Sequence, residues 1–148
     1  MAEQQTIRGA CLCGAVQFEV KPPTKWCAHC HCTMCRRAHG AGAVTWFGAH
    51  SDSFRLTAGA DHLTWYQSSP SARRAFCARC GSTLFFEGQR WPGEIHIARA
   101  SVPGPIDREP QAHVFYDVRV DWLTLHDELP KLGGPQGNEP LSPTRSER

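Results

Sequence analysis

The chain has 148 residues, the usual size of one domain and too few for two domains with separate cores. Hydrophobic residues make up 41% and charged residues 20%, which is typical of a folded globular protein and not of a disordered one. No window approaches the roughly 20 apolar residues of a membrane-spanning helix. The N-terminus lacks the charged start and apolar stretch of a secretory signal, so we expect a cytoplasmic protein with no membrane partner.

The formal net charge of +2 counts every thiol as neutral. Two Zn²⁺ ions bound by seven thiolates would change that charge to −1, because the seven ligands lose their protons and each ion adds two charges. The arginines are also scattered and form no basic stripe. We therefore predict no nucleic-acid partner.

The N-terminal part predicts a short polar arm followed by a strand. The arm covers residues 1–6, and the strand covers residues 7–20. Val16, Phe18 and Val20 alternate with polar residues, which predicts a strand with one buried and one solvated face.

The stretch 26–40 follows neither the helical nor the strand period, so we expect a loop there. Further short strands are expected at 44–47, 53–56, 62–67, 73–76, 83–87, 94–98 and 113–122. Many short strands without helix-length patterns indicate an all-β sandwich or barrel. We expect one β domain over 7–130 and, from its Gly, Pro and Ser content, a flexible tail over 131–148.

Eight cysteines stand in close pairs and clusters, and none follows Cys80. An even number also fits a secreted disulfide scaffold, but no secretory signal is visible and the chain is long enough for a core of its own. Closely spaced thiols in a reducing compartment more often bind metal. We therefore favour metal binding over disulfides.

Cys11 and Cys13 lie two apart on the predicted strand, so both thiols project from one face. Cys77 and Cys80 form a CxxC motif, followed by Gly81, at a predicted hairpin turn. Each pair supplies half of a tetrahedron, so together they predict one structural zinc with four cysteine ligands. That ion would close a long loop of chain.

Cys30, Cys32 and Cys35 place three thiols around one point, and three protein ligands leave the fourth position of a zinc ion open. Such an open position distinguishes catalytic from structural zinc. Cys27 is a possible fourth ligand that would close the site. Alternatively it is a small buried residue, which we favour because three ligands already satisfy an open site.

Charged and titratable side chains surround this cluster. Arg36 and Arg37 follow it directly and either steer anions or solvate a surface turn; for each arginine alone we favour solvation. His29, His31 and His39 are interpreted as neighbours of a metal loop and not as its ligands.

Three thiolates would leave a zinc site with one negative charge and therefore make it a weak Lewis acid. Such a site suits the binding of a fourth thiol, held as thiolate below the free-thiol pKa of about 8.5. A thiolate is a nucleophile, and a small aldehyde is a natural electrophile for it. The ligand set thus predicts thiol chemistry, without identifying the thiol.

The chain resembles the glutathione-dependent formaldehyde-activating enzyme family, which includes centromere protein V. Four segments carry the resemblance in order: CLCGAVQFEV, CHCTMCRRAHG, RRAFCARCGSTLFF and HVFYDVRVDWLTLHDELPKL. It implies an all-β fold of zinc-tied sheets, sometimes called a β-tent, and two zinc ions per chain. Their implied ligands are Cys11, Cys13, Cys77 and Cys80 for the structural ion, and Cys30, Cys32 and Cys35 for the second.

The resemblance also implies a reaction, the joining of glutathione and formaldehyde to S-(hydroxymethyl)glutathione, formally a carbon–sulfur lyase run in reverse. One fold family can host unrelated functions. The alternative is therefore a non-catalytic thiol carrier, or a zinc-stabilised binding module, on the same fold.

Overall fold

The computed structural model describes residues 5–141 and is mainly β, with antiparallel sheets in a single domain, as expected. No helix in that range is long and apolar enough to cross a membrane. The domain divides into two compact units. Within the described range, unit 1 comprises residues 5–27 and 46–109, and unit 2 comprises residues 28–45 and 110–141.

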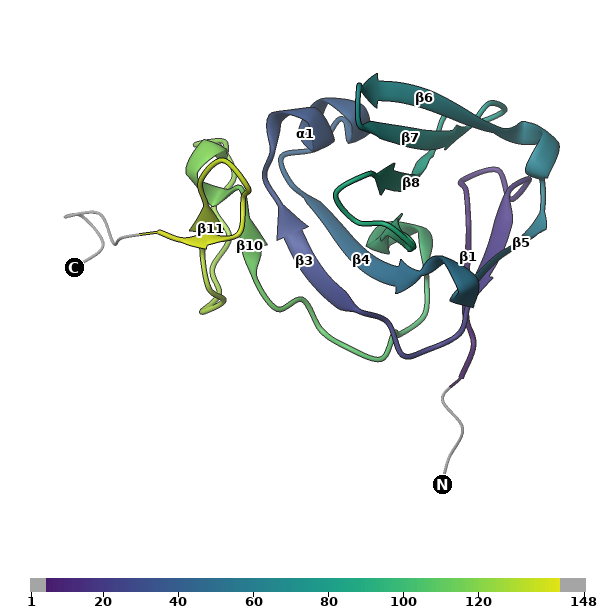
Figure 1. Ribbon diagram of the computed structural model, residues 1–148, viewed down its shortest axis with the longest axis horizontal. Coiled ribbons are helices and arrows are strands. Elements are labelled where there is room, and N and C mark those ends of the chain that lie inside the picture. The colour runs from purple at the N-terminus through teal and green to yellow at the C-terminus, as the bar shows by residue number, and fades with distance from the viewer. Residues whose placement is uncertain (1–4, 142–148) are drawn as a thin grey trace. The chain divides into compact units, whose positions relative to one another are not determined.

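Unit 1 contains two antiparallel sheets (Figure 1). The smaller has the order β1-β2-β5, from β1 (Ile7–Ala10), β2 (Gln17–Val20) and β5 (Phe54–Ala58). The larger has the order β4-β9-β8-β7-β6, from β4 (Val44–His50, in this unit from Trp46 on), β9 (Glu94–Ala98), β8 (Thr83–Gly88), β7 (Ala72–Cys77) and β6 (Leu63–Ser69). The 3-10 helices are η1 (Ser51–Ser53), η2 (Ala60–His62) and η3 (Arg99–Ser101).

The single strand expected over 7–20 is wrong. The chain turns back after β1, and β2 pairs antiparallel with it. Gly14 adopts a φ of 78°, and the Cys11 N–H donates to the Val16 carbonyl at 3.0 Å, which closes the turn. The expected inward face of the second half is confirmed, since Val16, Phe18 and Val20 are all buried.

Unit 2 contains the end of β3 (Trp26–Cys30), helix α1 (Thr33–His39) and the two-residue strand β10 (His113–Val114), which pairs parallel with β3. The loop expected over 26–40 is therefore wrong, because a strand and a helix occupy most of it. Helix α1 has no long apolar stripe. It begins where the Cys32 sulfur accepts a hydrogen bond from the Cys35 N–H, and it ends at Gly40 with a φ of 60°.

The strands expected over 113–122 are reduced to β10. Phe115 has a φ of 53°, in the left-handed region, and so ends the extended chain; the 3-10 helix η4 (Tyr116–Val118) follows. Further on, β11 (Leu132–Gly133) and β12 (Glu139–Pro140) form an antiparallel hairpin where composition predicts a tail. Gly134 and Gly137, with φ values of 80° and 77°, supply the turn between them. Residues 142–148 of the expected tail, and residues 1–4 of the expected arm, lie outside the described range.

The apolar core of unit 1 is built around Phe85 of β8, which is fully buried. Its ring makes edge contacts with Phe18 of β2, at a centroid distance of 5.1 Å, and with Phe54 of β5, at 4.9 Å. Edge-to-face geometry at these distances adds to the stabilisation from burial alone. Phe85 therefore connects strands of both sheets of unit 1.

Replacing this ring tests the core. We expect Phe85→Ala to lower the free energy of unfolding by about 3–5 kcal/mol, because the cavity removes contacts from both sheets. The matched control is Tyr66→Ala on β6, whose side chain is 64% exposed and should change stability by no more than about 0.5 kcal/mol. Urea unfolding followed by circular dichroism measures both; equal effects of the two variants would contradict this view of the core.

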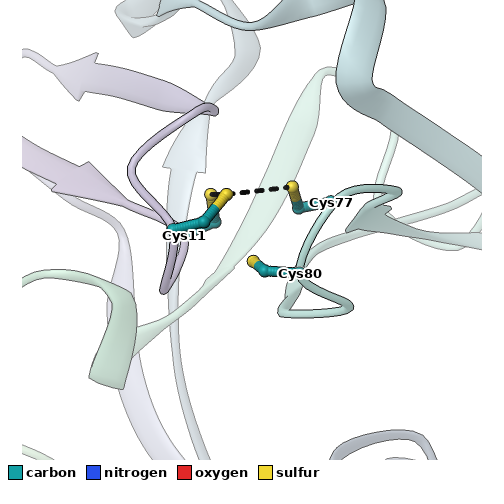
Figure 2. Close-up of side chains that lie close together, drawn as sticks. Cys11, Cys77 and Cys80 are labelled. Carbon is teal, nitrogen blue, oxygen red and sulfur yellow. Dashed lines mark hydrogen bonds between the residues drawn. The ribbon is translucent and has the colours of Figure 1, made fainter.

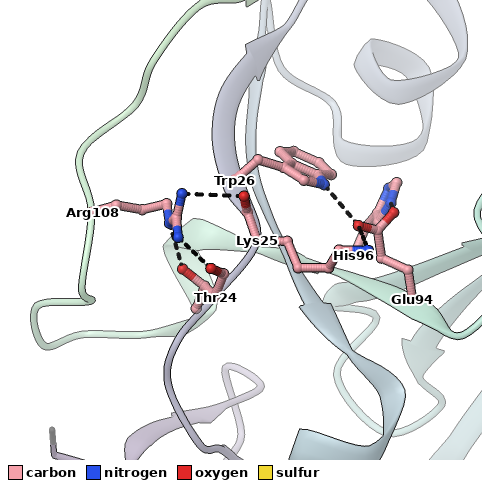
Figure 3. A network of polar contacts seen from close by, with 6 residues as sticks. All are labelled: Thr24, Lys25, Trp26, Glu94, His96 and Arg108. Atoms are coloured by element: carbon pink, nitrogen blue, oxygen red, sulfur yellow. Dashed lines mark hydrogen bonds and ion pairs between the residues drawn. The ribbon is translucent and has the colours of Figure 1, made fainter.

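A buried carboxylate, Glu94, organises a polar network in unit 1 (Figure 3). It accepts hydrogen bonds from the Trp26 indole at 3.1 Å and from His96 at 3.0 Å, and it pairs with the Lys25 ammonium at 3.1 Å. Burial alone would raise the pKa of Glu94. These three donors outweigh burial and lower that pKa to about 2.

The stabilisation from Glu94 should therefore depend on pH. The pKa of this carboxyl lies near 4.5 in the unfolded chain and at about 2 in the folded one, so its contribution is complete above pH 4.5 and is lost as pH falls toward 2. We expect Glu94→Gln to lower the free energy of unfolding at pH 7 by about 2 kcal/mol and to flatten its pH dependence in that window. The exposed control Glu128→Gln should keep the wild-type pH profile. Acid titrations of unfolding measure this, and an unchanged slope in Glu94→Gln would contradict it.

Candidate metal centres

The first candidate metal centre lies in unit 1, where two hairpin turns bring four thiols together. Cys11 and Cys13 come from the β1–β2 turn, Cys77 is the last residue of β7, and Cys80 lies in the turn that follows it. Their sulfur atoms all lie within 4.8 Å of one another. Figure 2 shows the labelled Cys11, Cys77 and Cys80 side chains converging from the two turns. The structure thus brings together the four cysteines that the sequence groups, although the first pair lies in a turn and not on a strand.

The distances between these sulfurs fit a tetrahedral zinc ion. A Zn–S bond of about 2.3 Å places neighbouring ligand sulfurs about 3.8 Å apart at the corners of a tetrahedron. The Sγ atoms of Cys11 and Cys13 are 3.6 Å apart, and those of Cys13 and Cys77 are 3.9 Å apart. A disulfide needs about 2.05 Å. No disulfide joins any of the eight cysteines, all of which lie in the described range.

Local backbone geometry prepares the turns for thiolates. A glycine follows each pair, and both Gly14 and Gly81 have a left-handed φ, 78° and 79°, that other residues rarely adopt. The Ser82 hydroxyl lies 3.2 Å from the Cys80 sulfur. Hydrogen bonds from the Ser82 side chain and backbone lower the pKa of Cys80 to about 5, so this thiol is set to lose its proton.

The second candidate centre lies in unit 2, at the junction of β3 and α1. The sulfur atoms of Cys30, Cys32 and Cys35 lie within 4.8 Å of one another, and those of Cys30 and Cys35 are 3.7 Å apart. Hydrogen bonding with Cys32 and then Cys35, together with burial, raises the pKa of Cys30 far above its usual value. Three thiolates so close together need a cation, and the spacing fits three corners of a zinc tetrahedron.

Cys27 is not part of this group of thiols. It is 1% exposed, belongs to the apolar core of unit 1, and burial raises the pKa of its thiol to about 11. Cys27 therefore occupies the kind of position that a small apolar residue would occupy. Among the described residues, the second cysteine group therefore has three members, and the role of Cys27 as a fourth ligand stays without support.

A chain of hydrogen bonds runs through unit 2 beside the second centre. His31 Nε2 lies 2.8 Å from His113 Nδ1, and His113 Nε2 lies 2.8 Å from an Asp127 carboxylate oxygen. The hydrogen bond from His113 lowers the pKa of Asp127. Burial, followed by the nearby His113, lowers the pKa of His31 to about 4, so His31 is neutral near pH 7.

One of these contacts fixes the position of a hydrogen. Since Nε2 of His113 faces a carboxylate, it carries a hydrogen and donates to Asp127. Nδ1 of His31 is buried and has no hydrogen-bond partner among the described residues. The sequence shows His31 as a neighbour of the thiols but carries no signal for His113 or Asp127, which are distant along the chain.

A protein-family model matches the part of the chain that contains both candidate centres. The model is that of GFA, the glutathione-dependent formaldehyde-activating enzyme, and it matches residues 6–118. The chain belongs to the GFA family. This membership agrees with the resemblance of the cysteine segments.

Two individual proteins are similar to this GFA-family chain. A protein of Halomonas elongata named "Putative glutathione-dependent formaldehyde-activating enzyme" is 31% identical over 128 residues, which cover 80% of each chain. A crystal structure of a Rhodobacter sphaeroides protein is similar with a TM-score of 0.58 and 30% identity, covering 68% of this chain and 92% of that one.

Metal content tests both centres. We expect two zinc ions per chain in protein purified under reducing conditions, one in Cys80→Ser, one in Cys32→Ser, and two in the control Cys27→Ala. Cys80→Ser should also lower the free energy of unfolding, by about 4 kcal/mol on a loop-closure estimate, because the thiols it separates come from turns 64 residues apart. Elemental analysis and thermal unfolding measure these outcomes. Loss of zinc from Cys27→Ala would contradict the three-thiol composition of the second centre.

Proposed function

We propose that this protein joins glutathione, or a similar small thiol, to formaldehyde or another small aldehyde, as a carbon–sulfur lyase acting in the direction of bond formation. The observation that carries the proposal is the group of Cys30, Cys32 and Cys35, which has no fourth thiol among the described residues. The GFA family model over residues 6–118 supports the identity of both substrates. The cytoplasm is the proposed location, since it keeps thiols reduced and holds a small-thiol pool.

The chemistry of the proposed reaction balances without any oxidant or reductant. The S–H proton leaves the thiol, a bond forms between sulfur and the aldehyde carbon, and the carbonyl oxygen gains a proton to become a hydroxyl. Cys30, Cys32 and Cys35 would hold a zinc ion, which when bound offers a fourth position that favours the thiolate form of a ligand near neutral pH. The addition also proceeds slowly without protein, so the task is to supply thiolate and orientation.

The chain's own residues would fix the geometry of this centre. The Cys35 N–H donates to the Cys32 sulfur at 3.2 Å and sets the position of that ligand at the start of α1. His31 lies between Cys30 and Cys32 in the sequence. Its ring is hydrogen-bonded to His113, and His113 is hydrogen-bonded to Asp127. The Cys35 N–H bond is of the kind that holds metal ligands in the required orientation.

A non-catalytic thiol carrier, or a zinc-stabilised binding module, is the second candidate. The same three-thiol group supports it, because an open zinc position binds a thiol whether or not an aldehyde follows. The two candidates differ in turnover and not in binding.

The test is the rate at which S-(hydroxymethyl)glutathione forms from glutathione and ¹³C-formaldehyde, followed by NMR. We expect catalytic amounts of zinc-loaded protein to raise this rate above the protein-free rate. Cys32→Ser should return the rate to that background, while Cys27→Ala, which leaves the three thiols in place, should retain the wild-type rate.

Folding of each variant is checked by circular dichroism. If folded Cys32→Ser accelerates the addition as the wild type does, the proposed role of the second centre fails. If the wild type binds glutathione but leaves the rate at background, the carrier is the better description.

A further inference from the structure

Unit 1 contains a cavity of about 340 Å³ that the proposed reaction does not use. Its lining comes from the β6–β7 turn, the end of β8, the loop between β8 and β9, and the start of η1. The cavity borders β7 at Ala72, whereas Cys77 of the first metal centre lies at the other end of that strand. At about 3.4 Å per residue these positions are about 17 Å apart, so the cavity is separate from the four thiols.

Backbone hydrogen bonds fix the walls of the cavity. The Ser51 N–H donates to the Gly93 carbonyl at 2.9 Å, and the Gln89 N–H donates to the Ser71 carbonyl at 2.9 Å. All four residues line the cavity, and the partners in each pair are distant along the chain. Cavities of this size accommodate small-molecule ligands, and a preformed one loses less conformational freedom when a ligand binds.

Trp91 supplies an aromatic wall whose position is fixed. Its ring packs against Phe86, at a centroid distance of 5.8 Å, and against His96, at 4.9 Å. The Arg90 guanidinium lies over the ring at 4.7 Å from its centroid. A Cβ built on Gly88 would lie 3.2 Å from a Trp91 ring carbon, so the glycine leaves room for the ring beside β8. The cavity therefore has one rigid apolar surface.

The charged residues of the lining are already paired. Arg73 donates to Glu87 at 2.7 Å, directly across the β7–β8 pair. The buried Glu94 pairs with the Lys25 ammonium at 3.1 Å (Figure 3). An ionic ligand would have to break one of these pairs, and separating the buried carboxylate from its partner is costly. The charges thus favour a neutral ligand.

Polar groups of fixed orientation complete the lining. The Nε and Nη2 atoms of Arg73 both donate to Oε2 of Glu87, which leaves Oε1 as an acceptor held in one direction. The Gln67 amide nitrogen donates to the Ser69 carbonyl at 2.8 Å, which orients the amide oxygen. Hydroxyl groups both donate and accept hydrogen bonds, so a ligand with several hydroxyls matches such a wall. The other neutral polar side chains of the lining are Ser51, Ser71 and Gln89.

We propose that this cavity is a binding site for a neutral polyhydroxylated ligand, a single sugar unit. The apolar C–H face of the sugar ring packs on Trp91, and its hydroxyls exchange hydrogen bonds with the polar wall. The inference goes beyond the proposed function. It adds a non-covalent site whose lining contains no cysteine and takes part in no bond-forming step.

NMR titration of the zinc-loaded, ¹⁵N-labelled full chain tests the inference. The ligands are the methyl glycosides of glucose, galactose and mannose, which have no free aldehyde and so cannot enter the proposed thiol–aldehyde reaction. We expect at least one of them to give saturable shifts of the Trp91 indole N–H and of the Gly88 and Gly93 amides, which line the cavity. A ligand of this size should bind with a Kd on the order of 1 mM.

Variants locate the site. Ser71 is exposed, so Ser71→Phe should keep the fold, fill the cavity and abolish the shifts. Trp91→Ala should raise Kd about tenfold, and Trp91→Phe should raise it less because an aromatic face remains. The matched control is Tyr66→Ala, which removes an exposed aromatic ring outside the lining and should keep the wild-type Kd. The dispersion of the same spectra shows that each variant is folded.

Four outcomes would overturn the inference. The first is the absence of saturable shifts with all three glycosides up to about fifty times the expected Kd. The second is equal affinity for cyclohexanol, which keeps a six-membered ring but has one hydroxyl. The third is tighter binding of tetramethylammonium, which would indicate a cation site. The fourth is unchanged glycoside binding in folded Ser71→Phe, which would place the ligand elsewhere.

Discussion

The convergence of cysteine sulfurs at tetrahedral spacing is the constraint on which this structure depends. In unit 1 the four thiols come from two turns 64 residues apart, so their positions are fixed only if both hairpins are correctly formed. The core around Phe85 supplies that accuracy, because its ring packs on strands from both sheets of the unit. A metal ion held by these four thiols would therefore bind tightly only when the whole unit is folded.

The two cysteine groups differ in the number of thiols and in their support. The group in unit 1 has four members, which matches a closed coordination shell, and it sits between hairpin turns. The group in unit 2 has three and is flanked by the polar chain of His31, His113 and Asp127. A zinc ion with only three protein ligands has an open fourth position, and hydrogen-bonded polar side chains are typical neighbours of such a site.

The sequence predicts the β class and both cysteine groups because short spacings such as CxC and CxxC restrict geometry locally. It misplaces Cys11 and Cys13 on a strand, since the alternation of Val16, Phe18 and Val20 gives no sign of where the strand begins. It misses α1 because a sulfur, and not a Ser or Asp, starts this seven-residue helix. The pairing of His31 with His113 depends on residues 82 apart, which no local pattern encodes.

The sulfur of Cys32 has two structural roles, as a member of the thiol group and as the acceptor that caps α1. A helix of seven residues is too short to be stable on its own, so the loss of that acceptor weakens its first turn. Replacement of Cys32 by alanine, which has no acceptor, would therefore do more than remove one thiol from the group. It would also disturb the short helix that carries Cys35, Arg36 and Arg37, so a change at one atom would move another thiol of the group together with the two arginines that follow it.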